Sequence, residues 1–464
     1  MENFEIEGVW WLPENPSVKL PGILRFSHEY GLVLEVLGLF KRLEKMTHFL
    51  APDIILGLSI RGKNITLYNC IEKAAKINLL GISKSTFIAD YGFIGVSFER
   101  ISDIKFKKVS IKYNHLGKWL NRSGFNRISI KGDSAKVEYE LPEPIVVVLN
   151  DKLKVKLEIR ANMSQKLEPK EVRIKEEIYF TLEFSEEEAF DEIYKYINMF
   201  QNLFTLLISE VVYPIQIIGN SEKAVRIFEE SKHYEPINIV YQLPISMIGS
   251  TNKAIYANEV FCPYEVIKDK IGGIFNNWLE KMELLKPVSD LYFGVVYSKN
   301  IFSEFKFLSL VLSLEAYHRR VIGNEDISNF EHEKRIREIL NSVPNEYREW
   351  LKEKLKYSNE PSLRKRLKQI FNLLKNIRYI DELVPDKKRF VDRVVNTRNY
   401  YVHYDKALKD KIIDAEQFYW YIQILKTIVL ACLLRETGFT DEEIDKLFMQ
   451  SKEFTWLLNQ VKKI

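Results

Sequence analysis

The chain has very few cysteines, three in 464 residues. Cys70, Cys262 and Cys432 lie far apart and lack Cys-x-x-Cys spacing, so they cannot form a zinc knuckle alone and make a poor disulfide framework. Outside one segment discussed below, the histidines are scattered without paired spacing, which argues against a metal site. The glycine loop of nucleotide-binding proteins and the nucleophile elbow of serine hydrolases are also missing. We therefore expect neither a metal nor another cofactor.

A long apolar run and a basic leader are lacking too. The most apolar late stretch, Ile424 to Leu434, is interrupted by Lys426 and is too short to span a bilayer. The acidic residues Glu2 and Glu5 stand where a signal peptide needs basic ones. The expectation is a cytoplasmic protein without a membrane anchor.

Neither sign of charge dominates, because 68 Lys and Arg stand against 64 Asp and Glu, a net charge of +4. A uniformly basic nucleic-acid coat protein is therefore excluded, and any binding charge must be local. The 46% of hydrophobic residues excludes an intrinsically disordered chain. The length corresponds to about two to four domains.

The first part of the chain has the pattern of β-strands. Over 153–159, leucine, valine and isoleucine alternate with lysine and glutamate, as in a half-buried strand. Frequent turn signals between such runs indicate a mostly antiparallel sandwich or barrel. Ser185 and Glu188 have the spacing of a capping box and predict a helix over about 186–208. A mixed stretch follows, with strands expected near 209–218 and 237–243 and a short helix at 221–230.

From about residue 265 the apolar period becomes helical. Ser328 and Glu331 form another capping-box pattern. We predict an α+β protein, with a β-rich, sandwich-like region over 1–265 and an all-α bundle over 266–464. The helices are expected at 302–321, 329–340, 344–357, 361–379, 386–402, 411–436 and 440–462.

The chemically informative residues lie at the end of the helix expected over 386–402. Arg398 and Asn399 are followed, after three residues, by His403. Metal-free RNA cleavage needs a fixed cation for the charge that builds on the phosphate oxygens, and a group that titrates near neutrality to move a proton. Arginine and histidine supply these two functions. Alternatively, both cations could simply stabilise the negative end of the helix dipole.

The spacing of Arg398 and His403 has a geometric consequence. Residues five apart diverge by about 140° around an ideal helix. The two side chains therefore meet only if the last turn is distorted or if a second copy of the chain completes the site. A symmetric pair of such helices favours a functional homodimer.

Basic residues gather between Leu351 and Arg378, nine against two acidic ones. Tyr357, Phe371 and Tyr379 lie among them. This pattern fits a surface that follows a nucleic-acid backbone, and it also fits an ordinary solvated helix face. The candidates for RNA contact are Arg364, Lys365, Arg366 and Lys368.

The segment Arg398-Asn399-Tyr400-Tyr401-Val402-His403 resembles the R-x4–6-H motif of the HEPN superfamily. The opening, Glu7 to Pro13 followed by Pro21 to Leu24, and the helix Phe307 to Arg319 resemble the Apea-like HEPN proteins, so the resemblance spans nearly the whole chain. It implies a HEPN-dimer endoribonuclease of anti-phage defence that needs no metal. By position, Arg398 would contact the scissile phosphate, His403 would be the acid/base group, and Asn399 would orient them.

The resemblance also gives a role to Glu315, which shares a helix face with core positions, where an unpaired carboxylate is costly. It makes Glu315 a polar residue that holds Arg398 in place. The alternative is a local ion pair with Arg319, four residues later.

The substrate implied by the resemblance is RNA, with tRNA as the expected class. Attack by the 2′-hydroxyl would leave a 2′,3′-cyclic phosphate and a 5′-hydroxyl, in an abortive-infection response. The β-rich region would sense a phage-derived trigger or regulate the nuclease. Two alternatives stay open: a HEPN-type protein that binds RNA or nucleotide without cutting, and a dimeric scaffold.

Overall fold

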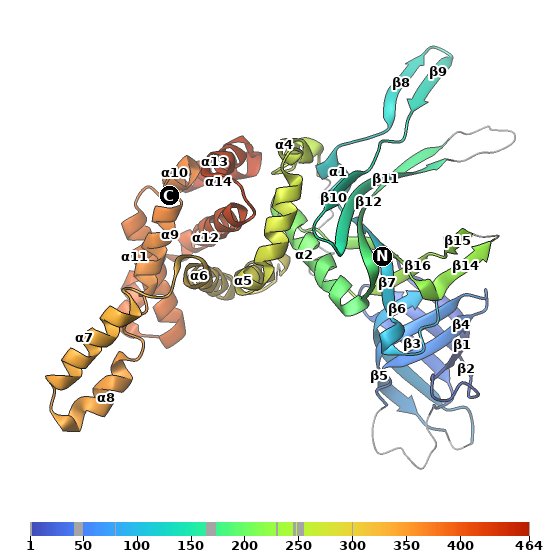
Figure 1. Ribbon diagram of the computed structural model, residues 1–464, viewed down its shortest axis with the longest axis horizontal. Helices are drawn as coiled ribbons and strands as arrows, with labels where there is room; N and C mark the ends of the chain where they lie inside the picture. Colours follow the sequence, from blue (N-terminus) through green and yellow to red (C-terminus); the bar gives the residue numbers. More distant parts are fainter. Residues whose placement is uncertain are drawn as a thin grey trace. The chain divides into compact units, whose positions relative to one another are not determined.

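The computed structural model describes residues 2–40, 50–78, 80–163, 173–228, 231–244, 247, 255–298 and 300–463. It divides into two compact units, Met1–Gly272 and Gly273–Ile464. The first is rich in strands and the second is helical (Figure 1), so the predicted α+β class is confirmed. The division falls after Gly272, whereas the sequence pattern placed it near residue 265.

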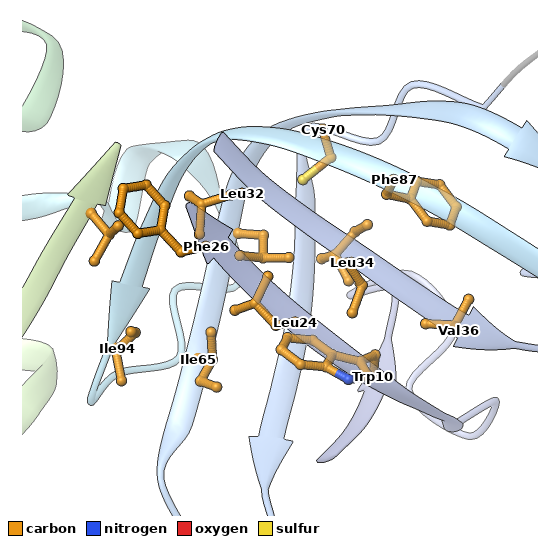
Figure 2. Packing of buried hydrophobic residues seen from close by; sticks show 13 residues of the cluster. Trp10, Leu24, Phe26, Leu32, Leu34, Val36, Ile65, Cys70, Phe87 and Ile94 are labelled. Carbon is orange, nitrogen blue, oxygen red and sulfur yellow. The ribbon is translucent and has the colours of Figure 1, made fainter. Parts of the chain in front are cut away.

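Six antiparallel strands close into a barrel in the first unit. They are β1 (Phe4–Trp11), β2 (Leu20–Ser27), β3 (Gly31–Leu37), β4 (Ile54–Ser59), β5 (Asn64–Lys76) and β6 (Lys84–Ile94). Their order is β6-β3-β2-β1-β4-β5, and β5 also pairs with β6, so no edge stays free. Alternate side chains fill the interior, as Figure 2 shows for Trp10, Leu24, Phe26, Leu34 and Phe87.

The same sheet continues beyond β6. Its further strands are, in order, β16 (Ile237–Tyr241), β13 (Pro214–Asn220), β7 (Lys105–Tyr113), β12 (Ile174–Ala189), β11 (Leu153–Met163) and β10 (Ile145–Val148). Helix α2 (Phe190–Ile208) packs against β7 and β12. The rings of Phe200 on α2 and Phe180 on β12 lie 4.5 Å apart. The alternation seen at 153–159 therefore belongs to β11, which lies one strand from the edge of this sheet.

The capping box predicted at Ser185 is wrong. Residues 185–189 continue β12, which pairs with β7 up to Ala189. The helix begins only at Phe190, and no side chain caps its first amides. Pairing with a strand distant in the sequence overrides the local signal, because a ladder satisfies the backbone groups that a cap would otherwise have to serve.

The predicted helix at 221–230 is wrong as well. Of this segment the structure describes 221–228, where Glu222–Ala224 form a single 3₁₀ turn and β14 (Val225–Phe228) follows, whereas 229–230 lie outside the described residues. Strand β14 pairs with β15 (Ser231–Tyr234). The short elements that complete the unit are η2 (Ile101–Asp103), α1 (Leu116–Leu120), the hairpin β8 (Phe125–Lys131) and β9 (Ser134–Tyr139), η4 (Ala257–Glu259) and α4 (Tyr264–Ile267).

The second unit is all-α. The helix predicted at 361–379 splits into α9 (Leu363–Leu373) and α10 (Arg378–Leu383), and the one at 440–462 splits at Ser451 into α13 (Asp441–Gln450) and α14 (Lys452–Val461). Ser328 caps its helix as predicted, accepting the Glu331 N–H. The other helices are α5 (Ile271–Tyr297), α6 (Ser303–Tyr317) with its π-helical extension His318–Ile322, α7 (Asn329–Asn341), α8 (Asn345–Leu355), α11 (Lys387–His403), the 3₁₀ segment η6 (Lys406–Lys411) and α12 (Ala415–Glu436).

Helix α12 contacts α6 and α13 in this unit. It is long and apolar enough to cross a membrane by length and composition, yet 67% of its most apolar window is buried within the protein. It packs against α6, where Phe307, Leu310 and Leu314 are at most 1% exposed. Helices α9 and α11 also contact α6, and these three helices carry the candidate functional residues.

Candidate active site

Helix α11 holds Arg398, Asn399 and His403 on a regular backbone. Its last turn is intact, because the Tyr404 N–H donates to the Tyr400 carbonyl and Tyr404 then adopts a left-handed conformation with φ 51°. The last turn is therefore not distorted. Within one chain, Arg398 and His403 lie on different sides of the helix.

Two contacts fix this end of the helix. The Thr397 hydroxyl accepts the Ile413 N–H at 2.9 Å and donates to the Arg393 carbonyl at 2.7 Å, so it ties α11 to the segment before α12. The ring of Tyr401 lies 5.9 Å from that of Phe418 on α12. The direction in which α11 presents its functional residues is therefore set by packing within this unit.

Arg398 is half-buried and faces Glu315 of α6. The Arg398 Nη2 and Glu315 Oε2 atoms are 3.8 Å apart, and Arg398 Nη1 donates to Asn399 Oδ1 at 3.1 Å. Among the described residues, neither Arg398 Nε nor Glu315 Oε2 has a hydrogen-bond partner, although both atoms are buried. Arg398 is therefore oriented by a carboxylate and an amide while some of its donor capacity stays unused.

The alternative local ion pair of Glu315 is not the one observed. Arg319, one turn later, bonds instead to Glu360, with Arg319 Nη2 donating to Oε2 at 2.8 Å. The structure thus brings Glu315, Arg398 and Asn399 together. His403 lies apart from them, exposed in the last turn of α11.

Arg366 is wrongly predicted as an RNA contact. Its side chain is 1% exposed, because α9 buries the face that carries Arg366, Leu367 and Ile370. The supposed aromatic interleaving is also wrong for Phe371 and Tyr379, which are core residues at 5% and 0% exposure.

The other candidate RNA contacts lie at the surface of α9. Arg364 contacts Asp392, and Lys365 pairs with Asp326 at 2.8 Å. Lys368 is exposed. Acidic residues from outside the basic stretch therefore neutralise part of its charge, which a count along the sequence does not reveal.

His318, which was not among the predicted site residues, is buried against Arg366. A signal was present: His318 lies four and seven positions after the core residues Leu314 and Val311, and so on the buried face of α6.

Among the residues that the structure describes, no group of three or more His, Cys, Asp or Glu side chains is placed to hold a metal ion.

Comparison with known proteins gives two matches to protein families. Residues 5–278 match the ApeA N-terminal domain 1, and residues 308–443 match the Apea-like HEPN domain. The first match covers more than half of the chain, and the second contains Glu315, Arg366, Arg398 and His403. No curated protein and no solved structure matches the chain.

Proposed function

Because the chain belongs to the ApeA family, with the N-terminal domain of that family and an Apea-like HEPN domain, we propose that it is a metal-independent endoribonuclease of anti-phage defence. HEPN domains of this family are generally ribonucleases, and they commonly bind RNA and dimerise. The observation that carries the proposal for this chain is the half-buried Arg398, held by Glu315 and Asn399 on the helix that ends at His403.

In the proposed reaction, His403 removes the proton from a ribose 2′-hydroxyl. The 2′-oxygen bonds to phosphorus, the bond from phosphorus to the 5′-oxygen breaks, and an acid protonates that leaving oxygen. The products are a 2′,3′-cyclic phosphate and a 5′-hydroxyl. Arg398 stabilises the charge on the non-bridging oxygens, because its planar fork of donors matches a phosphate.

We propose that two copies of the chain complete each site. Arg398 and His403 diverge on a regular helix. In the proposed dimer, a phosphate bound by Arg398 of one copy is therefore reached by His403 of the second copy and not by His403 of the same copy. The acid that protonates the leaving oxygen would then come from the same composite groove. In this dimer, Arg364, Lys365 and Lys368 would contact the backbone of the RNA, with tRNA as the proposed substrate class.

In the cell, the proposed setting is the cytoplasm, where cleavage would abort an infection. The barrel and its extended sheet would receive the phage-derived trigger.

The test compares wild type with Arg398→Ala and His403→Ala on total RNA in the presence of EDTA. We expect wild type to cut and each variant to lose about 10²–10⁴-fold in rate, the usual contribution of an acid/base or oxyanion-stabilising group. His233→Ala, an exposed histidine of β15, is the matched control and should cut normally. Equal cleavage by all the proteins, or loss of wild-type cleavage with the chelator, would contradict the mechanism. Binding without any cleavage would instead support the non-cleaving alternative.

A further inference from the structure

The extended sheet of the first unit carries charged side chains on the face opposite α2. Helix α2 covers the face on which Phe180 lies, with its Phe200 ring 4.5 Å from that of Phe180 (Figure 1). Because successive side chains of a strand point to opposite faces, the residues that alternate with Phe180 on β12, and their neighbours on β7 and β11, share the other face. We call the charged residues there the β-face cluster: Lys108, Lys112, Lys154, Lys156, Glu158, Arg160, Lys175, Glu177 and Glu183.

Each carboxylate of the β-face cluster is shared by two cations. The pairs, with N–O distances of up to 3.9 Å, are Lys154 and Lys156 at Glu183, Lys112 and Lys175 at Glu177, and Lys108 and Arg160 at Glu158. Six cations therefore stand against three carboxylates, and the cluster has a surplus of three positive charges. The side chains of these cations are between 23% and 57% exposed, so the surplus charge is accessible to an anionic partner.

Buried hydroxyl groups hold the middle of the cluster in place. Arg160 Nη2 donates to Ser110 Oγ at 2.6 Å, and the Thr181 hydroxyl donates to Glu158 Oε1 at 2.7 Å. The Arg160 guanidinium also lies over the ring of Tyr179, 4.3 Å from its centre. Ser110 and Thr181 are at most 1% exposed, whereas the Arg160 side chain is 37% exposed. The arginine is therefore fixed from below and open to solvent above, which lowers the entropic cost of binding a partner.

A cavity of about 650 Å³ adjoins the cluster where the extended sheet meets the barrel. Lys112 and Gln216 line it from the sheet, and Phe4 and His28 line it from the barrel. Cavities of about 300–1,000 Å³ hold small organic ligands, so this one has room for a single base. Its lining combines aromatic rings with polar groups, as the recognition of an unpaired base requires.

We propose that the β-face cluster binds the backbone of single-stranded RNA, with one unpaired base in the adjoining cavity. The surplus charge complements a polyanion, and lysine, arginine and side-chain amides are the groups that contact phosphate and sugar. This inference goes beyond the proposed function, whose RNA contacts all lie on the helical unit.

Two features favour single-stranded RNA over the other nucleic acids. Carboxylates stand among the cations, and they can accept a hydrogen bond from a ribose 2′-hydroxyl, a donor that the DNA backbone lacks. The cavity admits a base only if that base is unpaired, which a duplex does not offer.

The first test removes the surplus charge and leaves one cation at each carboxylate. The full chain with Lys154→Gln, Arg160→Gln and Lys175→Gln is titrated with a labelled uridine oligonucleotide at several salt concentrations, with fluorescence anisotropy as the readout. Each lost phosphate contact lowers the salt slope of a single strand by about 0.7, so we expect a decrease of about 2 and binding about tenfold weaker at low salt. The matched control replaces three exposed lysines outside the cluster, Lys63, Lys118 and Lys131, with glutamine and should bind as wild type does.

The second test locates the RNA on the chain. Acetic anhydride modifies accessible lysines, and peptide mass spectrometry reports the rate at each. The oligonucleotide should protect Lys154 and Lys156 severalfold and leave Lys63 unchanged. Protection of Lys368 on α9 without protection of Lys154 would overturn the inference, as would an unchanged salt slope in the triple variant.

Competition identifies the class of partner. The unlabelled RNA strand should displace the label, whereas DNA of the same sequence, the RNA duplex and polyglutamate should each compete at least about tenfold less well. Equal competition by DNA or the duplex would refute the choice of single-stranded RNA, and equal competition by polyglutamate would point to an acidic protein instead.

A second variant and the cleavage assay keep the outcomes separate. If the triple variant fails to fold, Glu183→Gln adds one positive charge to the face and should strengthen binding; unchanged binding would then reject the inference. If wild type cuts no RNA, the proposed nuclease function fails, and protection of Lys154 still decides whether this face binds RNA. A chain that cuts RNA without protection of Lys154 refutes the RNA-binding face alone.

Discussion

A heterodimer of two inactive chains tests how the active site is assembled. On the regular helix α11, Arg398 and His403 are separated by about 140° of rotation and about 7.5 Å of rise. The two side chains therefore project from different sides of the helix, which is about 10–12 Å wide. In the proposed reaction, His403 must lie within about 3 Å of the 2′-hydroxyl whose proton it removes, next to the phosphate that Arg398 binds. In the proposed dimer, Arg398 and His403 of one site therefore come from different copies of the chain.

The perturbation pairs an Arg398→Ala chain with a His403→Ala chain through two purification tags. If the site is composite, one groove contains both defects and the other contains neither. The doubly tagged protein should then cleave at about half the wild-type rate, as the two-fold symmetry of the dimer dictates. If each chain carries its own site, both sites are defective, and the rate stays about 10²–10⁴-fold below wild type.

The assay is cleavage of a 5′-labelled RNA by the doubly tagged protein. Doubly tagged wild type sets the full rate, and doubly tagged Arg398→Ala sets the background. A heterodimer no more active than this background would refute the composite site. A wild-type protein that is monomeric at the concentration at which it cuts would refute it equally.

Three further predictions concern separate parts of the molecule. Lys368→Glu should weaken RNA binding and its salt dependence without changing the unfolding midpoint, whereas Lys446→Glu on α13 should leave binding unchanged; filter binding at several salt concentrations measures this. Gly57→Ala should destabilise the barrel by about 1–3 kcal/mol in urea unfolding, because a Cβ there would lie 2.4 Å from the Trp10 ring. Hydrogen bonds from lysines, together with their charge, lower the pKa of Glu177 to about 2. The ionised Glu177 therefore stabilises the folded protein fully above its ordinary pKa of 4.5, and this stabilisation is lost as the pH falls through 2. Glu177→Gln should therefore cost about 1–2 kcal/mol at pH 7, allowing for its partial exposure, and nothing below pH 2.

Local patterns predicted the elements that carry the site. The helical period around Val311 and Leu314 places α6, and the period around Val391 and Val394 places α11. Such periods can be read from the sequence because a helix that is buried on one side repeats its apolar residues every three or four positions. The resemblance assigns Glu315 the role of holding Arg398, and the two side chains lie 3.8 Å apart.

Predictions failed where a distant part of the chain decided the outcome. The Ser185 signal lost to pairing with β7, which lies about 80 residues earlier. Arg366 looked like one more basic surface residue because a count of charges does not show which face of α9 is buried. The barrel closes because β5 pairs with both β4 and β6. The alternation of apolar residues along the sequence does not show this long-range pairing, and it leaves open whether the strands form a sandwich or a barrel.

The sequence by itself determined the spacing of Arg398 and His403, and with it their divergence on the helix, because the rotation per residue is a property of the backbone. Its composition also gives three cysteines and a nearly balanced total charge of +4. Only the tertiary structure decided which charges meet. Glu315 faces Arg398 rather than Arg319, because the packing of α6 against α11, and not proximity along the chain, brings these side chains together.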